Sequence, residues 1–234
     1  MGFCASTMSV FLLSDKIEFP PPHLATDDGL LAVGGDLSQE RLLLAYSMGI
    51  FPWFSGEEPI IWWSPDPRLV LYPREMRVSR SLNKTINKNA FHVTMDTAFD
   101  QVINECAQVR SRNNEDTWLV EDMINAYCKL HESGFAHSVE SWCEGKLAGG
   151  LYGVSLGRCF FGESMFTKKS DASKVAFVAL VKHLKALSFD MLDCQITTEH
   201  LIRFGAREIP RNQFILQLEK SLKVDNISGR WTFY

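Results

Sequence analysis

The chain has 234 residues, of which 46% are hydrophobic and 22% charged, enough for one large domain or two small ones with a packed core. Its formal net charge of −4 excludes a uniformly basic nucleic-acid-binding protein but not a local basic patch. No apolar run is long enough to span a bilayer, and the six cysteines follow no secretory signal and lack CxxC spacing. We therefore expect a cytoplasmic protein with reduced thiols, no membrane contact and no metal site.

The first predicted helix follows a glycine pair near the N-terminus. Gly34 and Gly35 permit a tight turn, and Ser38 is suited to cap the helix behind it. Gly49 is placed to end this helix. The apolar face of the helix comprises Leu42, Leu43, Ala45 and Tyr46. The spacing of these residues predicts a short amphipathic helix with one buried side.

Aromatic residues are concentrated just after this helix, in residues 50–54 and 60–65. Trp53 lies in the first segment, and Trp62 and Trp63 lie in the second. Two interpretations of these tryptophans are open. Packing in a core is the commoner role, and a platform for a ligand is the alternative.

A basic stripe follows a predicted strand over residues 68–73. Ser79 is suited to cap a helix in which Arg80, Lys84 and Lys88 share one face, because they are spaced by four residues. A solvated helix face is the simpler interpretation of such a run. The alternative is a phosphate-binding surface on an otherwise acidic protein.

Two further helices are predicted from the apolar periodicity of residues 97–108 and 119–133, and Gly134 is suited to end the second. The polar segment between them ends in Trp118. This segment is either a lid or a surface turn. Strands resume at residues 136–143 and lead into a hairpin.

The hairpin of residues 149–166 has a turn at residues 156–158. Strict alternation places Phe161, Glu163 and Met165 on one face of its second strand. A carboxylate among aromatic side chains is costly unless it is paired or used. Glu163 is therefore either satisfied by an arginine or backbone amide, or is a functional acid in a cleft.

The last third of the chain alternates helix and strand. A helix over residues 171–187 would bury a stripe that comprises Val175, Val178, Val181 and Leu184. In the strand over residues 191–196, Asp193 and Gln195 share one face. A helical turn and a helix over residues 212–223 follow. Together the elements predict an α+β fold with a mixed, largely antiparallel sheet.

Polar residues occupy positions in two of these strands where apolar residues are expected. If the strands are neighbours, Glu163, Asp193 and Gln195 converge at one cleft. Carboxylates with an amide suit the handling of an amine, since they accept its protons and orient its lone pair toward an acyl carbon. The sequence has no Ser-His-Asp spacing, HExxH motif or phosphate loop, and no Q/R-x-x-G-x-G/A loop for coenzyme A.

Short motifs spread over most of the chain resemble those of the bacterial leucyl/phenylalanyl-tRNA–protein transferases. The N-terminal motifs are GGDL at 34–37, AY at 45–46, GIFPWF at 49–54 and WWSPDPR at 62–68. The later motifs are TW at 117–118, HSVE at 137–140, GESMF at 162–166, SK at 173–174, DCQ at 193–195 and EIPR at 208–211. Their order along the chain makes the resemblance specific.

This resemblance implies a small N-terminal α/β domain over residues 1–66. It implies an acetyltransferase-like (GNAT-like) domain over residues 67–234 that does not use coenzyme A. The implied activity moves Leu or Phe, and less readily Met, from Leu-tRNA or Phe-tRNA to proteins that begin with Arg or Lys, which then enter N-degron proteolysis. We expect no cofactor, because the aminoacyl ester is already activated, and we expect a monomer.

The resemblance also implies roles for individual residues. Asp193 and Gln195 fall at the reaction centre, with Glu163 beside them. Trp53 and Trp118 fall near the terminal adenosine of the tRNA, and the basic stripe meets the tRNA body. The expected lining of the amino-acid pocket comprises Leu151, Phe160, Gly162, Ser164 and Leu192.

Two departures from the family pattern concern affinity and selectivity. Leu151 stands where methionine is common, and Asn83 and Asn87 thin the basic stripe where lysine is common. The sequence leaves open whether Asp193 is a general base or a positioning group, and whether Glu163 acts in chemistry or in acceptor recognition. The remaining alternatives are a non-catalytic binder of charged tRNA or protein N-termini, and a transferase with another amine acceptor.

Overall fold

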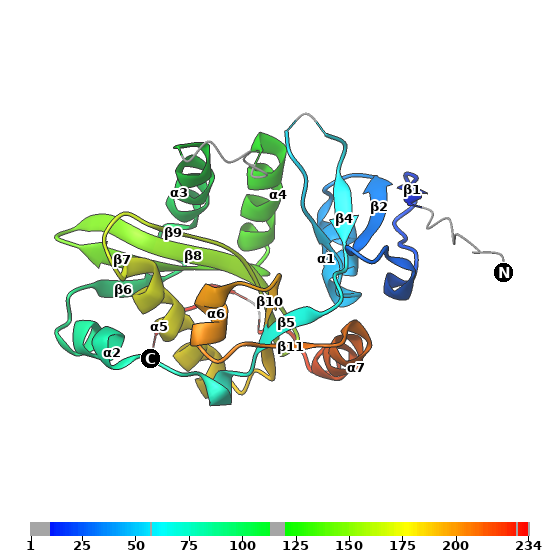
Figure 1. Cartoon of the computed structure of the whole chain (residues 1–234). Helices are drawn as coiled ribbons and strands as arrows, with labels where there is room; N and C mark the ends of the chain where they lie inside the picture. The colour runs from blue at the N-terminus through cyan, green and yellow to red at the C-terminus, as the bar shows by residue number, and fades with distance from the viewer. Residues whose placement is uncertain (1–9, 57, 113–119, 228, 234) are drawn as a thin grey trace.

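The structure is a computed structural model that describes residues 10–56, 58–112, 120–227 and 229–233 (Figure 1). The described residues form two sheets. The N-terminal sheet has four strands in the order β1-β2-β4-β3, with β1 parallel to β2 and the other pairs antiparallel. Its strands are β1 Phe11–Leu13, β2 Leu30–Gly34, β3 Phe51–Pro52 and β4 Ile61–Trp63.

The larger sheet has seven strands in the order β11-β5-β10-β9-β8-β7-β6. Its strands are β5 Arg68–Leu71, β6 His92–Met95, β7 Ala136–Cys143, β8 Lys146–Leu156, β9 Cys159–Thr167, β10 Met191–Gln195 and β11 Arg207–Ile209. Among the described strands of this sheet, only β9 and β10 pair in parallel. The expected α+β class with a mixed, largely antiparallel sheet is therefore confirmed.

Helices cover both faces of the larger sheet (Figure 1). Helices α3 and α4 pack on one face, and α5, with α2 beside it, packs on the other. The α-helices are α1 Gln39–Ser47, α2 Arg80–Asn87, α3 Phe99–Arg112, α4 Glu121–Glu132, α5 Ala172–Ala186, α6 Glu199–Arg203 and α7 Arg211–Ser221. Short 3-10 helices occur at Pro22–Leu24 and Pro73–Glu75. No described helix is long and apolar enough to cross a bilayer.

Three of the described helices begin at hydroxyl caps, and the sequence predicts two of these cap residues. The side chain of Ser38 accepts from the backbone N–H of Arg41, and that of Ser79 accepts from Leu82. Thr198 caps α6 in the same way. Each cap satisfies a backbone donor that has no partner within its helix.

The second strand of the hairpin departs from simple alternation at Glu163. The register of β8 against β9 shifts between Tyr152 and Gly153, so Glu163 is the extra residue of a β-bulge. Phe161 packs with the cluster on the α3–α4 side, and Met165 packs against the cluster on the α5 side. The expectation that Phe161, Glu163 and Met165 share one face is therefore wrong.

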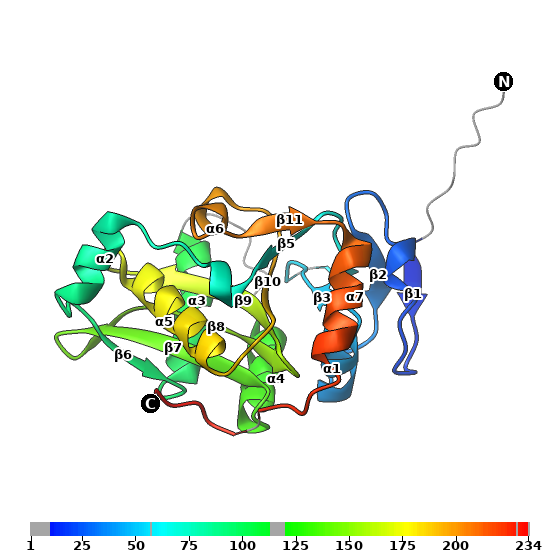
Figure 2. The same ribbon diagram turned by 90° about the horizontal axis from the view of Figure 1, so that it is seen from below.

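The N-terminal sheet and the larger sheet share one buried cluster, which includes Trp62 from β4, Phe161 from β9 and Phe214 from α7. Figure 2 shows α7 beside α1 and the N-terminal sheet. A Cβ at Gly49 would come within 2.8 Å of the ring of Phe214, so this close approach requires glycine. The expected boundary after residue 66 lies between β4 and β5, and it stays a prediction.

Candidate active site

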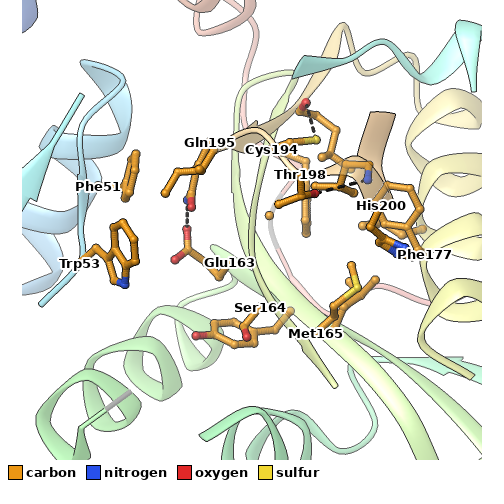
Figure 3. A pocket seen from close by; sticks show the side chains of 18 of the residues that line it. Phe51, Trp53, Glu163, Ser164, Met165, Phe177, Cys194, Gln195, Thr198 and His200 are labelled. Carbon is orange, nitrogen blue, oxygen red and sulfur yellow. Dashed lines mark hydrogen bonds between the residues drawn. The ribbon is translucent and has the colours of Figure 1, made fainter. Parts of the chain in front are cut away.

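A cavity of about 390 Å³ lies where the N-terminal sheet meets β8, β9 and β10. Phe51, Pro52 and Trp53 reach it from the N-terminal side. Its apolar wall comprises Leu151, Phe160, Met165, Phe177, Leu180, Leu192 and Leu201. Glu163 and Gln195 lie together on its polar side (Figure 3). The cavity thus joins an apolar space to one carboxyl–amide pair.

Glu163 is half-buried and receives hydrogen bonds from three different elements. Its Oε1 accepts from the Tyr46 hydroxyl of α1 and from Gln195 Nε2 of β10, both at 2.8 Å. Its Oε2 accepts from the Tyr127 hydroxyl of α4 at 2.9 Å. All of these donors are neutral groups, so the carboxylate has hydrogen bonds but no positively charged partner among them.

This environment raises the pKa of Glu163 from its ordinary value of 4.5 to about 7. Burial is the largest cause, because it disfavours the charged form. The hydrogen bonds from Tyr46, Tyr127 and Gln195 act in the opposite direction, and the negative charge of Asp193 adds to the increase. Near neutral pH, Glu163 therefore exists in both protonation states.

Asp193 has a contrasting environment, since it is fully buried and paired with a cation. Arg68 donates from Nε to Oδ1 at 2.8 Å and from Nη2 to Oδ2 at 2.7 Å. The guanidinium lies over the rings of Phe51 and Phe214, at 4.9 and 4.7 Å from their centroids. This bidentate geometry leaves Asp193 one well-defined orientation.

Asp193 is connected to Gln195 through the main chain. The backbone N–H of Gln195 donates to Asp193 Oδ1 at 2.9 Å, and the register of β10 against β5 shifts between the two residues. Gln195 has a φ of 61°, which an L-residue rarely adopts. Asp193 does not border the cavity in the described part of the chain, so it reaches the site through Gln195.

The residues expected to bind substrate collect around this cavity. All five predicted lining residues border it: Leu151, Phe160, Gly162, Ser164 and Leu192. Trp53 also borders it, is 41% exposed, and has its ring 5.9 Å from that of Trp63. Trp118 lies outside the described residues. The binding roles of these residues remain predictions.

The basic stripe lies on α2, none of whose described residues lines the cavity. Figure 1 shows α2 at the end of the molecule opposite the N-terminal sheet. Arg80 and Lys84 are exposed within the helix, and Lys88 is exposed at its C-cap. Among the described residues, no carboxylate forms an ion pair with these three side chains. They are therefore available for an anionic partner, and their contact with tRNA stays a prediction.

Sequence reasoning missed three residues of the site. The sequence pattern places Tyr46 on an apolar helix face and Tyr127 within a helix, yet both hydroxyls donate to Glu163. Arg68 was expected only as the first residue of a strand, yet it pairs with Asp193. The AY and WWSPDPR motifs contain Tyr46 and Arg68, so the motifs were the available signal for these two. In the described residues no group of His, Cys, Asp and Glu could hold a metal ion.

Residues 70–219 match the family described as leucyl/phenylalanyl-tRNA protein transferase, and residues 35–66 match its N-terminal domain. A leucyl/phenylalanyl-tRNA–protein transferase of Desulforapulum autotrophicum is 58% identical over 226 residues, which is 97% of this chain and 99% of the relative. One from Syntrophobacter fumaroxidans is 58% identical over 92% of each chain. The solved structure of L-PGS from Bacillus licheniformis aligns with 88% of this chain and 67% of its own chain at 10% identity, with a TM-score of only 0.39.

The extent of these matches shows that the chain belongs to the leucyl/phenylalanyl-tRNA–protein transferase family and is an aminoacyltransferase.

Proposed function

We propose that the chain transfers Leu or Phe, and less readily Met, from charged tRNA to the N-terminal α-amine of proteins that begin with Arg or Lys. The products are then marked for N-degron proteolysis. The observation that carries this proposal is the cavity in which an apolar wall adjoins the Glu163–Gln195 pair. Membership of the family supports the choice of an aminoacyl ester as donor and a protein as acceptor.

The donor's amino-acid side chain occupies the apolar wall of the cavity. This wall is apolar and includes Leu151, Phe160 and Leu192, so it favours Leu and Phe over polar side chains. The exposed face of Trp53 at the cavity offers a stacking surface for the terminal adenine. Base stacking of this kind contributes about 1–3 kcal/mol.

The reaction is aminolysis of an ester. The acceptor's neutral α-amine attacks the carbonyl carbon, the C–N bond forms, and the bond from that carbon to the ribose oxygen breaks. Gln195 donates its Nε2–H to Glu163, which leaves its amide oxygen to accept an N–H of the amine. Gln195 then orients the amine's lone pair toward the ester carbon.

Asp193 acts in this proposal as a positioning residue. Arg68 fixes its carboxylate from one side, and the carboxylate fixes the N–H of Gln195 from the other. The series Arg68–Asp193–Gln195 therefore determines where the Gln195 amide lies. This arrangement favours a positioning role over a general-base role for Asp193, since a carboxylate that is held by a bidentate arginine and does not line the described cavity is poorly placed to take a proton from substrate.

The body of the tRNA contacts the basic stripe. Arg80, Lys84 and Lys88 are exposed without carboxylate partners among the described residues, as phosphate contacts require. We expect the chain to act as a cytoplasmic monomer, with no cofactor.

The test of the function measures transfer of labelled Phe from Phe-tRNA to a peptide that begins with Arg. A peptide that differs only by an N-terminal Gly is the control. We expect product with the Arg peptide and little with the Gly peptide. Equal transfer to both would favour another amine acceptor, and donor binding without transfer to any peptide would favour a non-catalytic binder.

A further inference from the structure

Two tyrosines of the site have no role in the proposal above. The side chains of Tyr46 and Tyr127 are completely buried, although each carries a hydroxyl group. Tyr46 comes from α1 beside the N-terminal sheet, and Tyr127 comes from α4 on the larger one. Their hydroxyl oxygens are 2.5 Å apart, and each also contacts Glu163. The three side chains thus form a closed ring of hydrogen-bonding oxygens.

A count of protons shows that the ring accommodates both protonation states of Glu163. It has three contacts: Tyr46 to Tyr127 at 2.5 Å, Tyr46 to Glu163 Oε1 at 2.8 Å, and Tyr127 to Glu163 Oε2 at 2.9 Å. Each contact needs one proton. With Glu163 ionised, the two hydroxyls each donate to the carboxylate, which stabilises its negative charge. With Glu163 protonated, all three contacts are satisfied.

The ring is held rigid by its surroundings. The Tyr46 ring packs on Phe161 at a centroid distance of 5.0 Å, and the Tyr127 ring packs on Tyr152 at 5.4 Å. Burial, followed by the charge of Glu163, raises the pKa of both tyrosine hydroxyls well above the ordinary value. The tyrosines therefore remain neutral, and Glu163 is the member of the ring that gains and loses a proton.

We propose that Tyr46 and Tyr127 are positioning residues that close a hydrogen-bond ring on Glu163, and that this ring takes up and returns the proton exchanged during aminoacyl transfer. This inference rests on the proposed function, because the proton comes from the acceptor's amine. It gives Glu163 a role in proton transfer. It also explains why these two buried positions are tyrosine, which carries a hydroxyl group, and not phenylalanine.

The proton balance of the step is closed. As the C–N bond forms, the amine nitrogen loses one proton to the Glu163 carboxylate, and the ring then holds three protons. As the bond to the ribose oxygen breaks, the ring returns one proton to that oxygen, which leaves as a hydroxyl group. Glu163 is again ionised, so no other reactant is consumed. A group that acts first as base and then as acid works best when its pKa is near the working pH.

Other titratable groups near Glu163 do not replace it in this role. On β10, Asp193 is paired with Arg68, and on β8 the Tyr152 side chain is completely buried. His200 of α6 borders the same cavity, and burial lowers its pKa below the ordinary value. Gln195, the remaining polar contact of the carboxyl group, does not titrate.

The first experiment is a titration that needs no substrate. Carbon-13 NMR of glutamate-labelled protein follows the Glu163 carboxyl, which is identified by its loss in Glu163→Gln. We expect Tyr46→Phe and Tyr127→Phe each to raise the Glu163 midpoint by roughly one to two pH units, because each removes a donor to the carboxylate. Tyr72→Phe is the matched control, since its hydroxyl donates to Gln217 and not to Glu163. Circular dichroism confirms that each variant is folded.

The second experiment is the pH profile of single-turnover transfer in the same variants. The acceptor's α-amine has a pKa of about 7.7–8.0 with every variant, so a difference between the profiles of two variants reports on the enzyme. We expect the acidic limb of the pH–rate profile to move to higher pH together with the Glu163 midpoint. At high pH, where Glu163 is ionised in every variant, we expect the rate to return to that of the wild type. An unchanged Glu163 midpoint would show that the hydrogen-bond ring does not control this carboxyl group. An acidic limb that stays in place while the midpoint moves would show that the ring does not take part in transfer. Absence of transfer by the wild type would instead reject the proposed function, and the titration alone would then judge the ring.

Discussion

The two carboxylates on neighbouring strands of the large sheet have opposite environments. Asp193 on β10 is completely buried, and Arg68 donates a hydrogen bond to each of its carboxylate oxygens. Glu163 on β9 is half-buried, borders the cavity, and is held by neutral donors. A bidentate arginine holds a carboxylate in one orientation, whereas burial among neutral donors raises the pKa of the Glu163 carboxyl to about 7. One arginine therefore distinguishes the two carboxylates: it orients Asp193, and Glu163 has only neutral hydrogen-bond donors among the described residues.

Removal of the fixed charge should give the largest loss of stability. Asp193→Asn keeps the size of the side chain but leaves Arg68 buried without its counter-charge. Breaking a buried ion pair in this way typically costs about 3–5 kcal/mol. Urea unfolding at neutral pH measures this cost directly.

Glu163→Gln is the matched control for that experiment, because it removes the other carboxylate of the site. No charged partner is left behind, so we expect its cost to stay within about 1 kcal/mol. Equal losses for Asp193→Asn and Glu163→Gln would contradict the contrast between the two environments.

The titrating character of Glu163 should appear in the pH dependence of stability. Its pKa is raised from 4.5 to about 7, so the folded chain holds the proton more tightly than the unfolded chain does. The resulting stabilisation is complete below about 4.5 and is lost as the pH rises to about 7. The unfolding free energy of Glu163→Gln relative to wild type should therefore rise over this window by ~1–3 kcal/mol. A flat difference from about pH 4.5 to 8 would show that Glu163 is not perturbed.

The apolar wall should give graded discrimination between donors. Leu and Val charged on the same tRNA body differ only in the side chain that enters the cavity. We expect Leu to be preferred by about 1–3 kcal/mol in the specificity constant, the range for a methylene in an apolar pocket. Steady-state transfer with both donors measures this preference, and equal specificity constants would mean that the cavity does not bind the donor side chain.

The basic stripe should affect donor binding but not chemistry. Reversal of Lys84 and Lys88 to Glu should lower the logarithmic salt slope of charged-tRNA binding by about 0.7–0.9 for each lost phosphate contact. Reversal of the exposed Lys220 and Lys223 near α7 is the matched control. Transfer from a minimal aminoacyl-adenosine donor should be nearly unchanged, and an unaltered salt slope would remove the stripe from the tRNA interface.

Much of the fold could be predicted from the sequence, because local signals specify it. Ser38 and Ser79 cap the predicted helices, and residues 136–143 form β7 as expected. The short strands β6 and β11 were missed, since they carry no clear alternation and form by pairing with distant segments. Periodicity predicts elements well where one face is buried along their whole length.

The site could be predicted only in part, because its geometry depends on irregularities. The bulge at Glu163 and the positive φ of Gln195 turn both side chains away from the faces that alternation assigns. Tyr46 and Arg68 contact residues more than a hundred positions away, and no local pattern indicates such pairs. The family motifs contain the candidate residues Glu163, Asp193 and Gln195, and the structure shows which side chains contact them.

We propose that the Glu163–Gln195 pair is the reaction centre. The decisive measurement is single-turnover transfer of Phe from saturating Phe-tRNA to an Arg-starting peptide by folded Gln195→Ala. Loss of amine orientation should lower the rate by about 10²–10⁴, while the affinity for Phe-tRNA stays near that of the wild type. A near-wild-type rate in the folded variant would show that Gln195 does not orient the amine and is a structural residue of β10.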